Sequence, residues 1–219
     1  MRKSITYTLL AVLSVIYLFP VLWVVLSSFK NQTELYQWPP SIFPAEPVFT
    51  NYLDAFKSGN FDVYFMNSAI VTITSTILLL IINSMAGFAL AKYRFRGDTF
   101  LLIAFISTLM IPLEVIMIPI FKVISSLGLY NSLWGIIIPP AATPTGVFLM
   151  RQYMLTVPNE LLEAARMDGA GEWKIYWKII LPIAKPILSV LAIFSFMWRW
   201  DDFLWPLIVI NEPGKYTVQ

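Results

Sequence analysis

The stretch SITYTLLAVLSVIYLFPVLWVVLSSF, residues 4–29, carries no charged side chain between Lys3 and Lys30. A helix needs about 20 consecutive apolar residues to cross the hydrocarbon core of a bilayer. A signal peptide would have an apolar core of only about 7–15 residues before a small-residue cleavage site. This run is longer and ends in Ser-Phe-Lys without such a site. It therefore predicts a transmembrane helix over about residues 8–29, in which Pro20 is a tolerated kink.

The composition of the whole chain points the same way. Hydrophobic residues make up 58% of the sequence and charged residues only 13%, against roughly 25% charged in soluble domains. The formal net charge is +2 and the basic residues are scattered, which argues against a nucleic-acid partner. The chain has no Cys and no His, so it offers no thiolate or imidazole metal site and no Ser-His or Cys-His catalytic pair. We expect an all-α polytopic membrane protein without a metal site.

Four further weakly charged runs follow the first and are separated by polar segments. The segment 30–62 is Pro-rich and polar, which predicts an extramembrane loop with one short helix around residues 51–57. The second run contains Gly87 and Ala91, four residues apart. This pair either lets another helix approach closely or belongs to an ordinary lipid-facing helix. Together the runs predict one transmembrane domain over residues 1–219, with spans at about 8–29, 64–91, 99–121, 133–150 and 183–210.

Lys and Arg set the expected orientation, because they accumulate in cytoplasmic loops. With the N-terminus inside, ten of the 15 basic residues fall on the cytoplasmic side and five on the other side or at its boundary. The bias predicts a cytoplasmic N-terminus. It also places the polar segment 151–182 in the cytoplasm.

The segment 151–182 contains the run EAARMDGAGEWKIYWKIILP at residues 163–182. Pro158 suits the start of a helix, where its missing N–H costs nothing. Residues 159–168 are good helix formers, and Glu160 and Glu163 lie near the positive end of the helix dipole. Gly169 suits the left-handed position that commonly ends a helix. The pattern predicts a helix of about three turns.

A second helix is expected after Gly171. Its apolar residues recur at i, i+3, i+4 and i+7, and with nearby basic residues they suit the membrane–water interface. Pro182 is expected to limit its continuation into the last span. Such a pair of helices could pass a push from a cytosolic partner to the membrane, or could be a plain solvated connection. The expected apolar face consists of Trp173, Tyr176, Trp177 and Ile180.

The marked residues of this run resemble the EAA loop of permease subunits of binding-protein-dependent ABC importers. The resemblance rests on Glu163-Ala164-Ala165, Gly169 and Ile179-x-Leu181-Pro182, which occur at the spacing of that loop. It extends over most of the chain and is similar to the sugar-importer branch, as in the second permease of a maltose-permease-like pair. The other matching motifs are Phe65-Met66-Asn67-Ser68, Met110-Ile111-Pro112, Ile118-Pro119, Gly128-Leu129-Tyr130-Asn131 and Trp205-Pro206-Leu207.

The resemblance implies a type I ABC importer permease fold in the plasma membrane of a prokaryote. It implies a second permease subunit, two cytosolic ATPase subunits, an external solute-binding protein and a saccharide substrate, with membrane lipid around the chain. Glu163, Ala164, Ala165 and Gly169 would then lie at the ATPase cleft. The hinge to the last span, and with it the coupling to the ATPase, would involve Ile179, Leu181 and Pro182.

The family implies six helices, whereas five spans are counted here. The chain stops at Gln219, where the family would continue through an external loop into a last helix. Truncation, a fragment and a short form of the protein all remain open. If the last helix is absent, the completeness of the pore is in doubt.

No nucleotide site is expected on this chain. Gly214-Lys215 lacks the glycine five positions earlier, and Tyr216 stands where a Ser or Thr would reach magnesium. We therefore expect no cofactor on this chain, no enzymatic activity, and ATP with magnesium on the partner ATPase. Transport would follow alternating access.

Ionisable and aromatic residues in the spans are the candidates for the substrate path. Glu114 lies 16 residues after Asp98, about 24 Å along a continuous helix. It is either a ligand acceptor or a carboxylate tied to backbone near the prolines. Late in the last span, carboxylates and rings suit sugar hydroxyls and apolar ring faces, or else form an interfacial belt with Arg199 paired to a carboxylate. The candidates are Glu114, Trp198, Trp200, Asp201, Asp202 and, as a weaker one, Asn67.

Two other classes of function stay open at this point. An ATP-independent transporter or channel would need coupling residues in the middle of the membrane, and few central charges are found. A membrane scaffold would keep the polar segment without a solute path.

Overall fold

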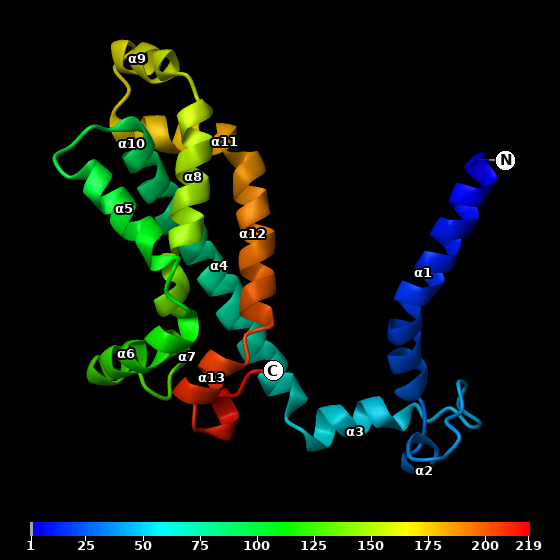
Figure 1. Cartoon of the computed structure of the whole chain (residues 1–219). Coiled ribbons are helices and arrows are strands. Elements are labelled where there is room, and N and C mark those ends of the chain that lie inside the picture. Colours follow the sequence, from blue (N-terminus) through cyan, green and yellow to red (C-terminus); the bar gives the residue numbers. More distant parts are fainter. Residues whose placement is uncertain (1) are drawn as a thin grey trace. The chain divides into compact units, whose positions relative to one another are not determined.

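The computed structural model describes residues 2–219, which form helices and connecting turns and no strand (Figure 1). The chain divides into two compact units, residues 1–61 and 62–219. The first unit holds the N-terminal helix, its loop and one further short helix.

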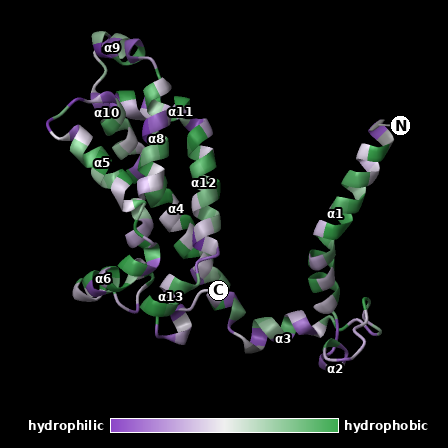
Figure 2. Ribbon diagram, viewed as in Figure 1, coloured by the Kyte–Doolittle hydropathy of each residue, from purple (hydrophilic) through white to green (hydrophobic). Residues whose placement is uncertain are grey.

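Unit 1 begins with α1 (Arg2–Ser27) and continues through the short α2 (Gln32–Leu35) to α3 (Thr50–Ser58). The part of α1 from Ile5 to Ser27 is long and apolar enough to cross a membrane, and none of it is buried within the chain. A helix that is apolar all round needs lipid or a partner around it. Figure 2 shows α1 mostly in hydrophobic colours.

Unit 2 is a helix bundle that starts within α4. Its elements are α4 (Phe61–Lys92), α5 (Asp98–Thr108), α6 (Leu113–Ser126), α7 (Leu133–Ile137), η1 (Pro139–Ala141), α8 (Pro144–Thr156), α9 (Asn159–Met167), α10 (Glu172–Ile175), the π-helix η2 (Tyr176–Ile180), α11 (Leu181–Ile183), α12 (Lys185–Trp200), α13 (Leu204–Val209) and η3 (Pro213–Lys215).

Three of the described helical segments can cross a membrane as they stand, and up to five can if each bent pair counts as one span. The expected span 99–121 is such a pair, because the chain changes direction by 110° between α5 and α6. Pro112 precedes α6 with extended backbone; it cannot continue α5, and it pushes the residue before it out of the helical region. The last expected span, 183–210, is also interrupted, since α12 ends at Trp200 and α13 starts at Leu204.

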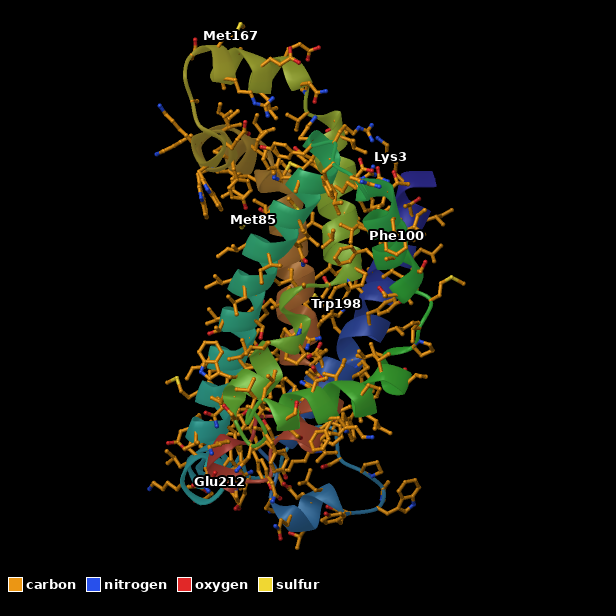
Figure 3. The ribbon with its side chains drawn as sticks, turned by 90° about the vertical axis from the view of Figure 1, so that its left-hand side faces the viewer. Lys3, Met85, Phe100, Met167, Trp198 and Glu212 are labelled. Carbon is orange, nitrogen blue, oxygen red and sulfur yellow. The ribbon has the colours of Figure 1, made fainter. Side chains whose placement is uncertain are left out.

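The two cores of unit 2 occupy opposite ends of the bundle. One packs α8, α9 and the helix after it around Met150, Met154 and Ile175, all fully buried. The other packs α4, α6, α7 and α13 around Ile124, Ile136 and Val209. Met167 and Glu212 lie at the two ends and Trp198 lies between them (Figure 3).

α4 carries buried polar contacts to several other helices. The Thr76 and Ser195 hydroxyls are 3.2 Å apart, joining α4 to α12. Ser84 Oγ and the Tyr176 hydroxyl are 2.7 Å apart. Asn83 Nδ2 donates to Thr143 Oγ1 at 3.2 Å, just before α8. Hydrogen bonds of this kind hold membrane helices together where apolar burial between helices gains little over lipid.

Gly87 lies where α4 and α8 approach closely. An added Cβ there would be 2.5 Å from Met150 Cβ and 2.8 Å from the Arg151 backbone nitrogen. The small residue is therefore required by packing, and the close-approach interpretation of this part of α4 is confirmed.

Candidate coupling loop and translocation path

The run after Pro158 folds as the short helix α9, from Asn159 to Met167. Gly169 has φ +75°, its N–H donates to the Arg166 carbonyl, and the Ala170 N–H donates to the Ala165 carbonyl at 2.9 Å. These two bonds form a Schellman cap, which needs a residue without a Cβ at the left-handed position. The predicted helix and its glycine stop are confirmed.

The two faces of α9 differ in what they contact. Leu162 and Ala165 are buried in the core of unit 2. Glu163 and Ala164 are exposed, and Met167 keeps 84% of its surface exposed at the tip (Figure 3). Only part of the expected coupling set is therefore available to a partner, because Ala165 packs within its own chain.

The second helix of the loop runs from Glu172 to Ile183 and includes a π turn at 176–180. Tyr176 and Ile180 are buried, whereas Trp173 and Trp177 are exposed. The predicted single aromatic face is wrong. A π turn holds more residues per turn than an α-helix, so the 3.6-residue period does not carry through it.

Pro182 lies inside this helix and does not end it. The chain bends by 77° only at the junction with α12. Of the residues expected at the hinge, Ile179 and Leu181 are partly buried and Pro182 is exposed. The bend follows them by two to five residues along the chain.

The cytoplasm-facing end expected for α4 contacts the start of α9 and the chain just beyond its end. Lys92 Nζ donates to Asn159 Oδ1 at 2.9 Å and to the Val157 carbonyl, where α9 begins. Tyr93 donates its hydroxyl to Glu172 Oε2, beyond the end of α9. We call this arrangement, with Arg166, the α4 latch.

Arg166 completes the α4 latch. Its Nε donates to Glu172 Oε1 at 2.8 Å, and its guanidinium lies 6.0 Å from the centre of the Tyr93 ring. Sequence reasoning missed these residues because the contacts join positions up to 79 apart. The available signal is Lys92 at the end of α4 and Tyr93 directly after it, together with the acidic start of the second helix.

Burial and the neighbouring Glu172 carboxylate raise the pKa of the Tyr93 phenol above its ordinary value. The hydrogen bond to Glu172 raises the pKa of Arg166. Both groups keep their protons at neutral pH. The Tyr93 contact is therefore fully present there and is lost only as the pH rises through the raised pKa.

Replacing Tyr93 with phenylalanine tests the α4 latch. We expect the loss of one hydrogen bond of about 1 kcal/mol, or about five-fold in the population of the latched loop. The backbone amides of α9 should then exchange hydrogen several-fold faster, because the loop is held to α4 less of the time. The measurement is hydrogen–deuterium exchange of residues 159–172 of the chain in nanodiscs.

The exposed Arg94, which pairs with Asp98 at 3.5 Å outside the α4 latch, is the matched control. Arg94→Gln should leave the exchange unchanged. Equal exchange in wild type and Tyr93→Phe would show that the Tyr93 hydroxyl does not hold the loop to α4.

Residues from α5, α6, η1, α8 and α12 line a cavity of about 360 Å³ in unit 2. Trp198, Arg199 and Asp202 reach it from the end of α12. Arg199 Nη1 lies 2.8 Å from Asp202 Oδ2, and each of the two side chains keeps 17% of its surface exposed. Asp202 Oδ1 also accepts the Trp205 backbone N–H at 3.3 Å. The cavity combines an indole, a held carboxylate and threonine hydroxyls, a mixture that suits a polyhydroxylated ligand.

The other path candidates lie elsewhere. Trp200 stacks on Phe196 with centroids 5.8 Å apart and meets Phe65 edge-on. Asp201 is exposed and does not line the cavity. The structure therefore brings together only Trp198 and Asp202 of the candidates late in the last expected span.

Two earlier candidates also have other surroundings. Asn67 donates to the Gly214 and Tyr216 carbonyls at 3.1 and 3.0 Å, which ties the C-terminal segment to α4. Glu114 is exposed in the first turn of α6. The 24 Å offset assumed for it required a continuous helix, and the 110° bend between α5 and α6 removes that premise.

Among residues 2–219, no group of three or more His, Cys, Asp or Glu side chains is placed to hold a metal ion.

Residues 83–219 match the family described as binding-protein-dependent transport system inner membrane component. The arabinooligosaccharides transport system permease protein AraQ of Bacillus subtilis (strain 168) is 37% identical over 209 residues, covering 94% of this chain and 74% of that protein. The diacetylchitobiose uptake system permease protein NgcG of Streptomyces coelicolor is 32% identical over 217 residues, covering 98% and 72%.

A chain in the crystal structure of a bacterial ABC transporter involved in the import of the acidic polysaccharide alginate superposes with a TM-score of 0.87. Its sequence is 26% identical, and the match covers 98% of this chain and 76% of that one. The chain thus belongs to the binding-protein-dependent transport system inner membrane components, as a multi-pass permease subunit of the sugar ABC importer branch.

Proposed function

We propose that this chain forms one half of a saccharide path and pairs with a second permease subunit. Two cytosolic ATPase subunits bind ATP with magnesium and supply the energy, and an external binding protein delivers the solute. The chain itself holds no cofactor. Alternating access then moves the solute without chemical change.

The observation that carries the proposal is the structure of α9 and its contacts. This short helix ends in a glycine cap and exposes Glu163, Ala164 and Met167 at one end of unit 2. The α4 latch ties the start of α9 to Lys92 at the end of a long membrane helix, and it ties Glu172, just beyond α9, to the next residue, Tyr93. An ATPase subunit that binds the exposed face of α9 therefore acts on α4 as well as on the helix leading into α12.

The basic residues support a cytoplasmic position for this end. Lys92, Arg94, Arg151, Arg166 and Lys174 all belong to segments at or near the α9 end of unit 2. By the positive-inside rule that end faces the cytoplasm, as does the N-terminus.

A saccharide is the proposed cargo because the cavity offers Trp198, a carboxylate and hydroxyls together. Two relatives are named for arabinooligosaccharides and diacetylchitobiose. Competition of these two compounds with uptake by the assembled transporter would narrow the class of sugar.

Crosslinking tests the proposed contact between the ATPase and α9. The chain has no native cysteine, so only the introduced one can react. Single variants Ala164→Cys and Met167→Cys, coproduced with the ATPase, should crosslink to it in a nucleotide-dependent way. Ala165→Cys, which is buried in the same helix, should react far less.

Asn211→Cys is the control at the other end of unit 2, where the backbone N–H of this exposed residue donates to Asn131 Oδ1. It should react with an impermeant maleimide from outside the cell, and Ala164→Cys only in inverted vesicles. A membrane-inserted complex in which Ala164 and Met167 give no ATPase crosslink would overturn the proposed coupling.

A further inference from the structure

The loop after α1 folds back toward the membrane helix that precedes it (Figure 1). Lys30 is buried, its Nζ lies 4.8 Å from the centre of the Trp23 ring, and it donates to the Ser41 carbonyl. Trp23 belongs to the stretch Ile5–Ser27 that can cross a membrane. The chain around Ser41 therefore lies beside the last turns of α1 instead of projecting away along the helix axis.

Hydrogen bonds give this loop a defined shape. The Ala45 N–H donates to Glu34 Oε1 at 2.9 Å, which closes the segment 35–45. The Val48 N–H donates to the Phe29 carbonyl at 2.8 Å. Asn51 Nδ2 donates to the Ser28 carbonyl at 2.9 Å. Hydrogen bonds before and after residues 35–45 therefore fix the position of this segment.

That surface is aromatic and uncharged. Tyr36, Trp38 and Phe43 keep 89%, 88% and 71% of their surface exposed. No charged residue occurs from 35 to 45, and the nearby cation, Lys30, is turned inward. Exposed apolar patches on a built surface mark a place of interaction, and Trp and Tyr are enriched where a protein meets the membrane–water interface.

We propose that residues 35–45 dock into the bilayer interface at the end of α1 away from the N-terminus. The occupant of the surface is lipid, because the loop folds back beside a membrane helix and carries no charge that would need water. The attachment is apolar and independent of headgroup charge, since residues 35–45 contain no cation that could bind an anionic lipid. In this arrangement the loop limits how far α1 can slide along the membrane normal.

Spin labels on single cysteines test the depth of the loop in the full chain reconstituted in phosphatidylcholine nanodiscs. Trp38→Cys and Phe43→Cys carry the label, and the exposed Glu46→Cys is the matched control outside the uncharged segment. Collisions with oxygen should exceed collisions with a water-soluble nickel complex at 38 and 43. The order should reverse at 46, and adding phosphatidylglycerol or salt should change neither.

Two results would overturn the proposal. Nickel accessibility at 38 and 43 equal to that at 46 would place the loop tip in water. Low accessibility to both reagents would show a protein contact instead of lipid. As a measurement without labels, shallow-brominated lipid should quench less tryptophan fluorescence in Trp38→Phe than in wild type, and equal quenching would also count against docking.

Discussion

Asp202→Ala should destabilise the folded chain by about 3 kcal/mol, at the lower end of the cost of breaking a buried ion pair. The reason is that Arg199, whose side chain is mostly enclosed beside the cavity, loses the carboxylate 2.8 Å from its Nη1. A guanidinium left without a partner in an apolar region costs more than the pair itself contributes. The midpoint of thermal unfolding in nanodiscs measures the effect.

The double variant Arg199→Met with Asp202→Asn separates structure from transport. It removes both charges but keeps a side-chain oxygen for the Trp205 N–H, so most of the lost stability should return. Asp54→Asn, an exposed carboxylate on α3, is the control for the loss of a single charge. A double variant no more stable than Asp202→Ala would contradict the ion-pair explanation.

Uptake by the same double variant decides the role of the pair. If the midpoint of thermal unfolding recovers while uptake stays low, the cavity contacts the solute, as proposed. If both recover, the pair is structural and the path lies elsewhere.

Gly87→Val should cost about 3 kcal/mol or more, at or above the upper end for overpacked cores. The added Cβ would meet the backbone and Cβ of Met150 and the Arg151 nitrogen, and backbone cannot turn aside as a flexible side chain can. Pushing α4 away from α8 should also weaken the α4 latch. The latch residue Lys92 follows Gly87 by only five positions along α4. The yield of folded protein and its unfolding midpoint check this.

Ala104→Val on the exposed surface of α5 adds the same side chain away from that contact. It should leave the midpoint nearly unchanged. Equal losses at 87 and 104 would mean that the branched side chain, and not the helix contact, causes the effect.

The features that could be predicted from the sequence are those determined by residues close together along the chain. Long uncharged runs indicate membrane helices whatever they pack against. The helix α9 follows from Pro158, a run of helix formers and Gly169, all within 12 residues. Its exposed face could not be chosen locally, because the side that Ala165 occupies depends on contacts with distant helices.

The differences between expectation and structure have physical causes of the same kind. A hydrophobic run such as 99–121 fits either one straight helix or two helices joined at an angle, and only packing decides between them. The π turn at 176–180 shifts the face of the second helix without any change in composition. Trp200 and Asn67 suit a sugar site by type, yet their contacts are with Phe196 and with the C-terminal backbone. Residue type does not say which neighbour a side chain will meet.

The length and continuity of α4 have a mechanical consequence. Its 32 residues contain no proline and correspond to roughly 48 Å at 1.5 Å per residue. One end is tied to the segment around α9 and the other to the C-terminal segment. The bends of the chain lie elsewhere, 110° between α5 and α6 and 77° ahead of α12. We therefore expect a displacement applied at the α9 end to reach the other end of α4 as a tilt of the whole helix, because α4 has no proline at which it could bend.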